Sequence, residues 1–461
     1  MSADSRIVII GAGPGGLGAA WRLRELGHAN WLIVEAGDHA GGLASSVLDA
    51  GGFTWDLGGH VLFSHYPYFD QVMDAALGDA WVEHIREAWV WMRDRWIPYP
   101  FQNNVWRLPA GDLTACISGL LDLQLSTRAV SPPPPRSFRE WLLASFGAGI
   151  CEVFMLPYNR KVWAYDPSRL DVGWMGERVA TVDVKRVLAN LVQRRDDVSW
   201  GPNATFRFPL HGGTGAIWRA VAGRLPPAQL HFQRTVRAVD LDRKQITMTD
   251  GESIRYDHLI STMPLDELLR CLVGRPQLGE AASRFVYSSS HIIGVGLQGN
   301  PPDDLKTKCW IYFPEDRVPF YRATVFSNYS PNNVPTASPH WSLMAEVSES
   351  PDKPVNASTI VAEAVAGFQS CGFIDPASVV STWHRRLEHG YPTPWLGRDA
   401  VVAPIEAELR AAGVFSRGRF GAWKYEVSNQ DHSFMQGVEA VDHILNGAAE
   451  ATVRGERGLG R

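Results

Sequence analysis

Residues 6 to 35, RIVIIGAGPGGLGAAWRLRELGHANWLIVE, decide the fold of this chain. The apolar run from Ile7 to Ile10 predicts one buried strand. Gly11, Gly13 and Gly16 follow it in G-x-G-x-x-G spacing. Such glycines permit a tight turn, a close approach of a pyrophosphate to the backbone, and close packing of a helix on the strand.

The same stretch continues into a helix and a second strand. Apolar residues from Leu17 to Leu26 repeat at helical spacing, and Trp31 to Val34 predicts the second strand. Glu35 ends that strand, 19 residues after Gly16, where the fingerprint needs a carboxylate for a ribose. The helix N-terminus would hold the phosphates. The order of these features indicates dinucleotide binding; the alternative, a plain βαβ unit with a glycine-rich turn, does not explain Glu35.

Two further glycine pairs lie in the same region. Gly41-Gly42 precedes Leu43 and Ala44, and Gly58-Gly59 precedes His60. The first pair would bring backbone N–H groups against the dinucleotide, and the second would lie against a ring system. A hairpin turn is the alternative for each pair.

Bulk composition restricts the function. The chain has 461 residues, 45% hydrophobic and 20% charged, with a formal net charge of −5, so neither nucleic acid nor an anionic membrane is an expected partner. No apolar run approaches the roughly 20 residues of a membrane span. The early first strand leaves no room for a signal peptide, and five scattered cysteines indicate reduced thiols. We therefore expect a cytoplasmic protein.

The predicted fold class is α/β, with a Rossmann-like dinucleotide-binding domain, a helical insertion domain and an antiparallel β-sheet domain. Residues 280 to 400 predict short strands alternating with loops. The predicted division is cofactor domain 1–88, a β-hairpin joining the sheet domain 89–107, helical substrate domain 108–199, cofactor domain 200–262, antiparallel-sheet substrate domain 263–414, and cofactor domain with C-terminal helix 415–461.

Long motifs along the chain resemble the flavin-dependent UDP-galactopyranose mutases, and are most similar to the type found in fungi and protozoan parasites. The resemblance covers nearly the whole chain. The motifs that carry it are GGLAS at 41–45, GGHVLFSHY at 58–66, PYPFQNN at 98–104, PYNRKVWA at 157–164, GERVA at 176–180, WGPNATFRFP at 200–209, YFPED at 312–316, PFYRATVFSNYSP at 319–331, HGYPTP at 389–394 and RGRFGAWKYEVSNQDHSF at 417–434.

The resemblance implies an isomerase of galactofuranose biosynthesis that interconverts UDP-galactopyranose and UDP-galactofuranose. It implies non-covalent FAD, active when reduced, whose N5 attacks the anomeric carbon, expels UDP and opens the sugar through a flavin iminium. NADPH would then be a reductant that shares the substrate site, and a homo-oligomer stays open. No metal is implied.

The resemblance also assigns residues by motif position. The catalytic group is Arg178, Arg322 and His60, with the two arginines on the diphosphate and His60 over the flavin. The substrate-binding group is Tyr99, Phe101, Gln102, Tyr158, Asn159, Trp163, Asn203, Tyr312, Tyr329, Tyr391, Arg419, Tyr425 and Asn429. The cofactor-binding group is Gly11, Gly13, Pro14, Gly15, Gly16, Glu35, Gly42, Leu43, Ala44, Gly59, His60, Val236, Asn429, Gln430 and Ser433.

Three other functions stay open at this stage. A ring-contracting mutase could act on another nucleotide sugar. An FAD-dependent oxidoreductase of the amine-oxidase type would share the cofactor domain, but it needs an apolar substrate tunnel where this chain places arginine and tyrosine. A non-catalytic FAD-binding module would not need those polar aromatic residues.

Overall fold

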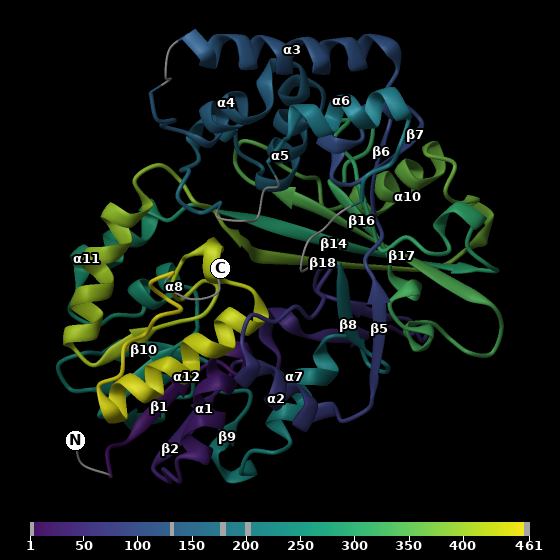
Figure 1. The fold of residues 1–461 in the computed structure, drawn as a ribbon. Coiled ribbons are helices and arrows are strands. Elements are labelled where there is room, and N and C mark those ends of the chain that lie inside the picture. The colour runs from purple at the N-terminus through teal and green to yellow at the C-terminus, as the bar shows by residue number, and fades with distance from the viewer. Residues whose placement is uncertain (1–3, 130–132, 176–180, 199–203, 456–461) are drawn as a thin grey trace.

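The computed structural model of the protein describes residues 4–129, 133–175, 181–198 and 204–455. Arg178, Asn203 and the GERVA motif lie outside these ranges, so the predictions for them stay predictions. Three parts are stacked in Figure 1: the cofactor domain at the bottom, a large sheet across the middle and a helical domain on top.

A five-stranded parallel sheet forms the centre of the cofactor domain. Its strand order is β19-β13-β1-β2-β9, and each pair of neighbours is parallel. All four residues of β1 are buried, as the apolar run predicts, because helices and loops cover both faces. The strands are β1 (Ile7–Ile10), β2 (Trp31–Val34), β9 (Leu230–His231), β13 (His258–Ser261) and β19 (Val414–Ser416).

Helices α1 and α12 pack against each other beside this sheet, at the bottom of Figure 1. They approach closely because glycines meet the facing backbone: a Cβ on Gly437 would lie 1.9 Å from the carbonyl oxygen of Gly15. Helices α8, α9 and α11 bury leucines and valines in the same core as β1, so this core extends past the predicted boundary at residue 262. The helices of this domain are α1 (Pro14–Glu25), α2 (Pro67–Leu77), α7 (Gly215–Ala222), α8 (Leu265–Arg270), α9 (Pro276–Ala281), α11 (Arg398–Ala411) and α12 (Gln430–Asn446).

The middle layer is a mixed seven-stranded sheet of order β18-β14-β17-β16-β15-β6-β7. The hairpin of β6 and β7 joins its edge by pairing with β15 and has a two-residue turn at Arg93 and Asp94, while residues 101–103 and 105–107 form two short 3-10 helices. The strands are β6 (Ala88–Met92), β7 (Arg95–Pro98), β14 (Tyr287–Gln298), β15 (Trp310–Tyr312), β16 (Arg322–Val325), β17 (His340–Glu349) and β18 (Val379–Pro392).

The prediction of short strands in residues 280–400 holds for β15 and β16, with 3 and 4 residues, but is wrong for the other strands of the sheet in this range. Strands β14, β17 and β18 contain 12, 10 and 14 residues, and helix α10 (Ile360–Ser370) covers one face of the sheet. Strand β14 contains three serines and two glycines, residue types that are uncommon within long strands. Gly294 and Gly296 are there because the rings of Trp55 and Phe53 pack on them; a Cβ at either position would lie 2.6 Å from a ring carbon.

The helical domain covers the other face of the sheet and shares one core with it. Its run Phe138–Trp163 is, among the described residues, the one helical segment long and apolar enough to cross a membrane. The run bends at Gly147 (φ +71°), and 44% of its most apolar window is buried inside the protein, so it forms part of this core. The helices are α3 (Ala110–Ala129), α4 (Phe138–Ile150), α5 (Leu156–Trp163) and α6 (Val184–Gln193).

Smaller strand pairs complete the fold. They are β3 (Ser46–Leu48) with β4 (Thr54–Asp56), β5 (Trp81–Ile85) with β8 (Thr205–Pro209), and β10 (Val236–Asp240), β11 (Gln245–Met248) and β12 (Ser253–Arg255) in one meander. All five cysteines are unpaired, as predicted.

Candidate active site

The first half of the site is the turn between β1 and α1. Gly13 is the N-cap of α1 and provides no side-chain cap, so the first N–H groups of the helix are left for a ligand. Glu35 follows β2 and turns toward this turn, where its Oε2 accepts a 2.6 Å hydrogen bond from Ala12 N. The carboxylate therefore lies beside the phosphate-binding turn, as the ribose interpretation requires.

A second helix N-terminus meets the first. Helix α12 begins after Asn429, which also provides no side-chain cap, and Ser433 O lies 3.2 Å from the Cβ position of Gly15. Gly41 and Gly42 contact Gly13 from the other side. Two uncapped helix N-termini, a carboxylate and the glycine pair Gly41-Gly42 suit a ligand with two phosphates and a ribose, so the chain's residues fit FAD.

The remaining predicted cofactor residues lie around these turns. Leu43 and Val236 both pack on the core of the five-stranded sheet. The Gln430 side chain accepts a 2.8 Å bond from Trp218 Nε1, so the backbone of Gln430 is what the helix N-terminus offers a cofactor. Pro14 and Gly16 lie in the first turn of α1, and Ala44 is buried in the short helix after Gly41.

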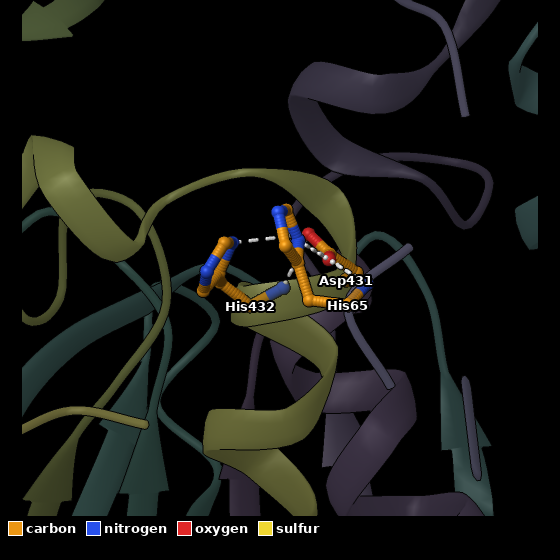
Figure 2. A group of neighbouring side chains, drawn as sticks. All are labelled: His65, Asp431 and His432. Atoms are coloured by element: carbon orange, nitrogen blue, oxygen red, sulfur yellow. Dashed lines mark hydrogen bonds and ion pairs between the residues drawn. The ribbon is translucent and has the colours of Figure 1, made fainter. Parts of the chain in front are cut away.

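Figure 2 shows how the start of α12 is anchored to the segment that carries His60. Asp431 accepts bonds from the backbone N–H and Nδ1 of His65, at 3.1 and 2.7 Å, and from the backbone N–H of His432 at 2.8 Å. His432 Nδ1 lies 3.1 Å from the same carboxylate. Burial opposes it, but the two histidines hold the pKa of Asp431 well below its ordinary value. These atoms lie within 4.8 Å of one another, as metal ligands do, yet donors already surround the carboxylate, which makes the cluster an anchor.

The second half of the site is a group of rings and guanidinium groups that we call the tyrosine–arginine cluster. The ring of Tyr312 lies 5.0 Å from Tyr99 and 5.5 Å from Tyr158, and Tyr391 lies 5.8 Å from Tyr425. The cluster comprises Tyr99, Tyr158, Tyr312, Tyr391, Tyr425, Arg322 and Arg419. Sheet strands, helix α5 and the loop before α12 contribute these residues, which brings together positions more than 300 residues apart.

Both arginines are held in place. Arg322 begins β16 and lies directly opposite Glu346 on β17, with Nε and Nη2 donating to its two oxygens at 2.7 and 2.8 Å. Arg419 lies 4.9 Å above the Tyr391 ring and donates to Gly390 O and Ser428 Oγ. Arginine forms strong bonds to phosphate oxygens, so the cluster has the chemistry to hold a diphosphate.

His60 lies between the two halves. Burial lowers its pKa to about 4, while nearby Glu346 raises that pKa, and Arg419 and Arg322 lower it. The histidine is therefore neutral at physiological pH. Its Nδ1 is buried and has no hydrogen-bond partner among the described residues, so it has a free polar atom at the place where the two halves meet.

Several predicted substrate residues lie one layer behind the cluster. Phe101 is fully buried and stacks at 4.3 Å on Phe154, which in turn stacks on Tyr158. Tyr329 is fully buried among Phe206, Phe208, Trp310 and Phe326. Trp163 packs edge-on against Tyr391 and Tyr425. These side chains support the cluster instead of lining it.

Two more residues predicted to bind the substrate, Gln102 and Asn159, are buried or bonded within the protein. Gln102 is 2% exposed, at the start of the segment that follows Tyr99. Asn159 donates to Met155 O, one turn earlier in the same helical run, at 2.8 Å.

The sequence interpretation missed Glu346 and Tyr321, whose hydroxyl donates to Glu346 at 2.8 Å. The sequence could have indicated Glu346, because an acid within an apolar strand such as β17 is rare unless a cation pairs with it.

Fold and site together define a dinucleotide-binding enzyme with a cationic, tyrosine-rich substrate region. The sequence pattern of the flavin containing amine oxidoreductases matches residues 14–444. A crystal structure of a reduced UDP-galactopyranose mutase is 52% identical over 98% of both chains, with a TM-score of 0.94. The chain therefore belongs to the flavin containing amine oxidoreductase family and, within it, to the UDP-galactopyranose mutases, which makes it a flavoprotein with FAD in its reduced form as cofactor.

More distant structures share the fold. A putative protoporphyrinogen oxidase from Exiguobacterium sp. 255-15 is 15% identical over 96% of this chain and 99% of its own, with a TM-score of 0.70. Putrescine oxidase bound to putrescine is 14% identical over 96% and 99%, with a TM-score of 0.64. Both likenesses confirm the predicted fold class.

Proposed function

We propose that the protein interconverts UDP-galactopyranose and UDP-galactofuranose while its flavin is reduced. The main support is the 52% identity over 98% of the chain to a reduced UDP-galactopyranose mutase. The tyrosine–arginine cluster supports it independently, because a diphosphate that leaves a sugar needs cations and hydroxyl donors around its oxygens.

Reduced FAD would supply the nucleophile for the anomeric carbon. The chain's own residues would bind and orient the substrate and stabilise the leaving diphosphate. Arg322 and Arg419 bind the diphosphate as charge develops on it when the sugar–oxygen bond breaks. The hydroxyls of Tyr391 and Tyr425, beside Arg419, add neutral donors. Their rings, packed on Trp163, keep these donors in place before substrate binds.

His60 contributes orientation without charge. Its low pKa keeps the ring neutral between pH 5 and 8, so it does not compete with the arginines for the diphosphate. A neutral ring can donate from one nitrogen and accept at the other. We place it over the flavin, where a buried polar atom without a partner would gain one.

Three finer points belong to the same proposal. The motif resemblance supports a mutase of the fungal and protozoan type. NADPH is the proposed reductant, using the substrate region, since the described ranges contain a single parallel sheet with a phosphate-binding turn. Arg178 and Asn203 are proposed to bind the substrate.

The test is an anaerobic conversion assay. The purified protein, reduced with dithionite, receives UDP-galactofuranose, and the nucleotide sugars are separated by chromatography; an oxidised sample is the control. We expect UDP-galactopyranose in the reduced sample alone. A fully flavin-loaded, reduced protein that leaves the sugar unchanged would contradict the proposal, and oxygen uptake with an amine would favour the amine-oxidase alternative.

A further inference from the structure

The buried carboxylate of Glu346 accepts hydrogen bonds from three different residues of the site. It lies in the middle of β17, is 2% exposed, and accepts four hydrogen bonds. Arg322 Nε and Gly59 N donate to Oε1, at 2.7 and 3.1 Å. Arg322 Nη2 and the Tyr321 hydroxyl donate to Oε2, each at 2.8 Å.

These four bonds connect separate parts of the site. Gly59 precedes His60 in the segment that we propose to lie against the flavin. The Tyr321 hydroxyl lies 3.3 Å from the Tyr391 hydroxyl of the tyrosine–arginine cluster. Strand register adds a third link, because Tyr312, Arg322 and Glu346 lie directly opposite one another on three adjacent strands. One carboxylate thus holds the flavin-facing segment, an arginine and, through Tyr321, a tyrosine.

The geometry also fixes which atoms of Arg322 remain available. Its Nε and Nη2 are bound to Glu346, while Nη1 makes no hydrogen bond or ion pair to any residue in the described ranges. The Arg322 side chain is 20% exposed and the Glu346 side chain only 3%. The pair therefore leaves Nη1 as the guanidinium nitrogen that is not bound to Glu346, and it keeps the carboxylate buried.

We propose that Glu346 is a positioning residue: it aims Nη1 of Arg322 at the substrate diphosphate and fixes Gly59, and with it His60, relative to that arginine. The inference rests on the proposed function, since it assigns Nη1 to the diphosphate. It predicts that orientation, and not the net charge of the site, is what Glu346 provides.

Glu346→Gln separates these two effects. The amide keeps one acceptor oxygen but sets an NH2 group against two of the four donors, so Arg322 loses one of its two bonds, and the site gains one unit of net positive charge because the carboxylate is gone. We expect kcat to fall at least tenfold with normal flavin content, while the Kd for UDP in the reduced protein stays within threefold of wild type or tightens. Glu349→Gln is the matched control, because Glu349 lies on the same strand and pairs with Arg386 away from the site; it should leave kcat and Kd unchanged.

A double variant tests whether Glu346 acts through Arg322. Arg322→Ala alone strands the buried acid, so it should lower the unfolding midpoint, and adding Glu346→Gln should raise that midpoint again. Turnover of the double variant should be higher than the product of the two single losses predicts, because Glu346 acts in part through Arg322 and in part through Gly59. The unfolding midpoints can be compared in flavin-free protein and without any measurement of turnover.

Each result has one meaning. Wild-type kcat in Glu346→Gln overturns the proposal, as does a joint loss of flavin content and UDP affinity. Turnover losses in the double variant that multiply in full, or an unfolding midpoint that Glu346→Gln fails to restore, also overturn it. If Arg322→Ala loses turnover while Glu346→Gln does not, only the positioning role fails. If the wild-type protein does not convert the sugar, the proposed function fails. The unfolding midpoints of the single and double variants then still test whether Glu346 and Arg322 form the ion pair.

Discussion

Replacing Gly437 by alanine tests whether the contact between α12 and α1 builds the flavin site. The new Cβ would lie 1.9 Å from Gly15 O and 2.8 Å from Ala19 N, both backbone atoms that cannot rotate away. Reaching an ordinary contact of about 3.4 Å requires the helices to separate by more than about 1 Å. Overpacking of this kind costs about 1–3 kcal/mol.

Part of that cost should appear in cofactor binding, because the N-termini of both helices hold the phosphates. We expect FAD to bind Gly437→Ala at least tenfold more weakly, a loss of about 1.4 kcal/mol. The assay is fluorescence titration of the flavin-free protein with FAD, together with the unfolding midpoint. Gly111→Ala is the control, because its Cβ would meet no atom within 4 Å and should leave FAD affinity unchanged. Wild-type FAD affinity and unfolding midpoint in Gly437→Ala would refute the reasoning.

Three further substitutions test other parts of the site. Gly59→Ala puts a Cβ 2.9 Å from Glu346 Oε1, so turnover should fall at least tenfold in a steady-state assay with flavin retained; normal turnover would count against the contact. Asp431→Asn removes the carboxylate that His65 donates to, and should cost about 1–3 kcal/mol in urea unfolding, whereas an unchanged midpoint would show that the anchor contributes nothing. Burial lowers the pKa of Lys161 from 10.5 to about 7. Between pH 7 and 10.5 the unfolded chain therefore binds more protons than the folded protein, so the free energy of unfolding of the wild type should rise with pH. Lys161→Met lacks that rise, so its stability relative to wild type should decline from pH 7 to 10; a difference independent of pH would contradict the shift.

The cofactor half of the site could be predicted from the sequence because its features are local. The glycines, the apolar strands and Glu35 lie within 30 residues of one another, so a single short pattern contains all of them. The structure confirms the turn, the helix N-terminus and the position of Glu35 beside them.

The substrate half could be predicted only through the resemblance, since its residues meet through strand register. Nothing near Arg322 in sequence shows that Glu346 lies opposite it; that follows from the pairing of β16 with β17. Gly294 and Gly296 in β14 depend on the tertiary structure in the same way. They leave space for rings from another part of the chain, a contact that no local pattern encodes.

The central claim is that the protein breaks the bond between the anomeric carbon and the diphosphate of UDP-galactose. The most direct measurement uses UDP-galactopyranose with oxygen-18 in the bridging position, incubated anaerobically with reduced protein and recovered for phosphorus NMR. We predict that the label moves into the non-bridging positions of the β-phosphate with reduced protein and stays in place with oxidised protein. A label that stays in the bridge with reduced, flavin-loaded protein would contradict the account.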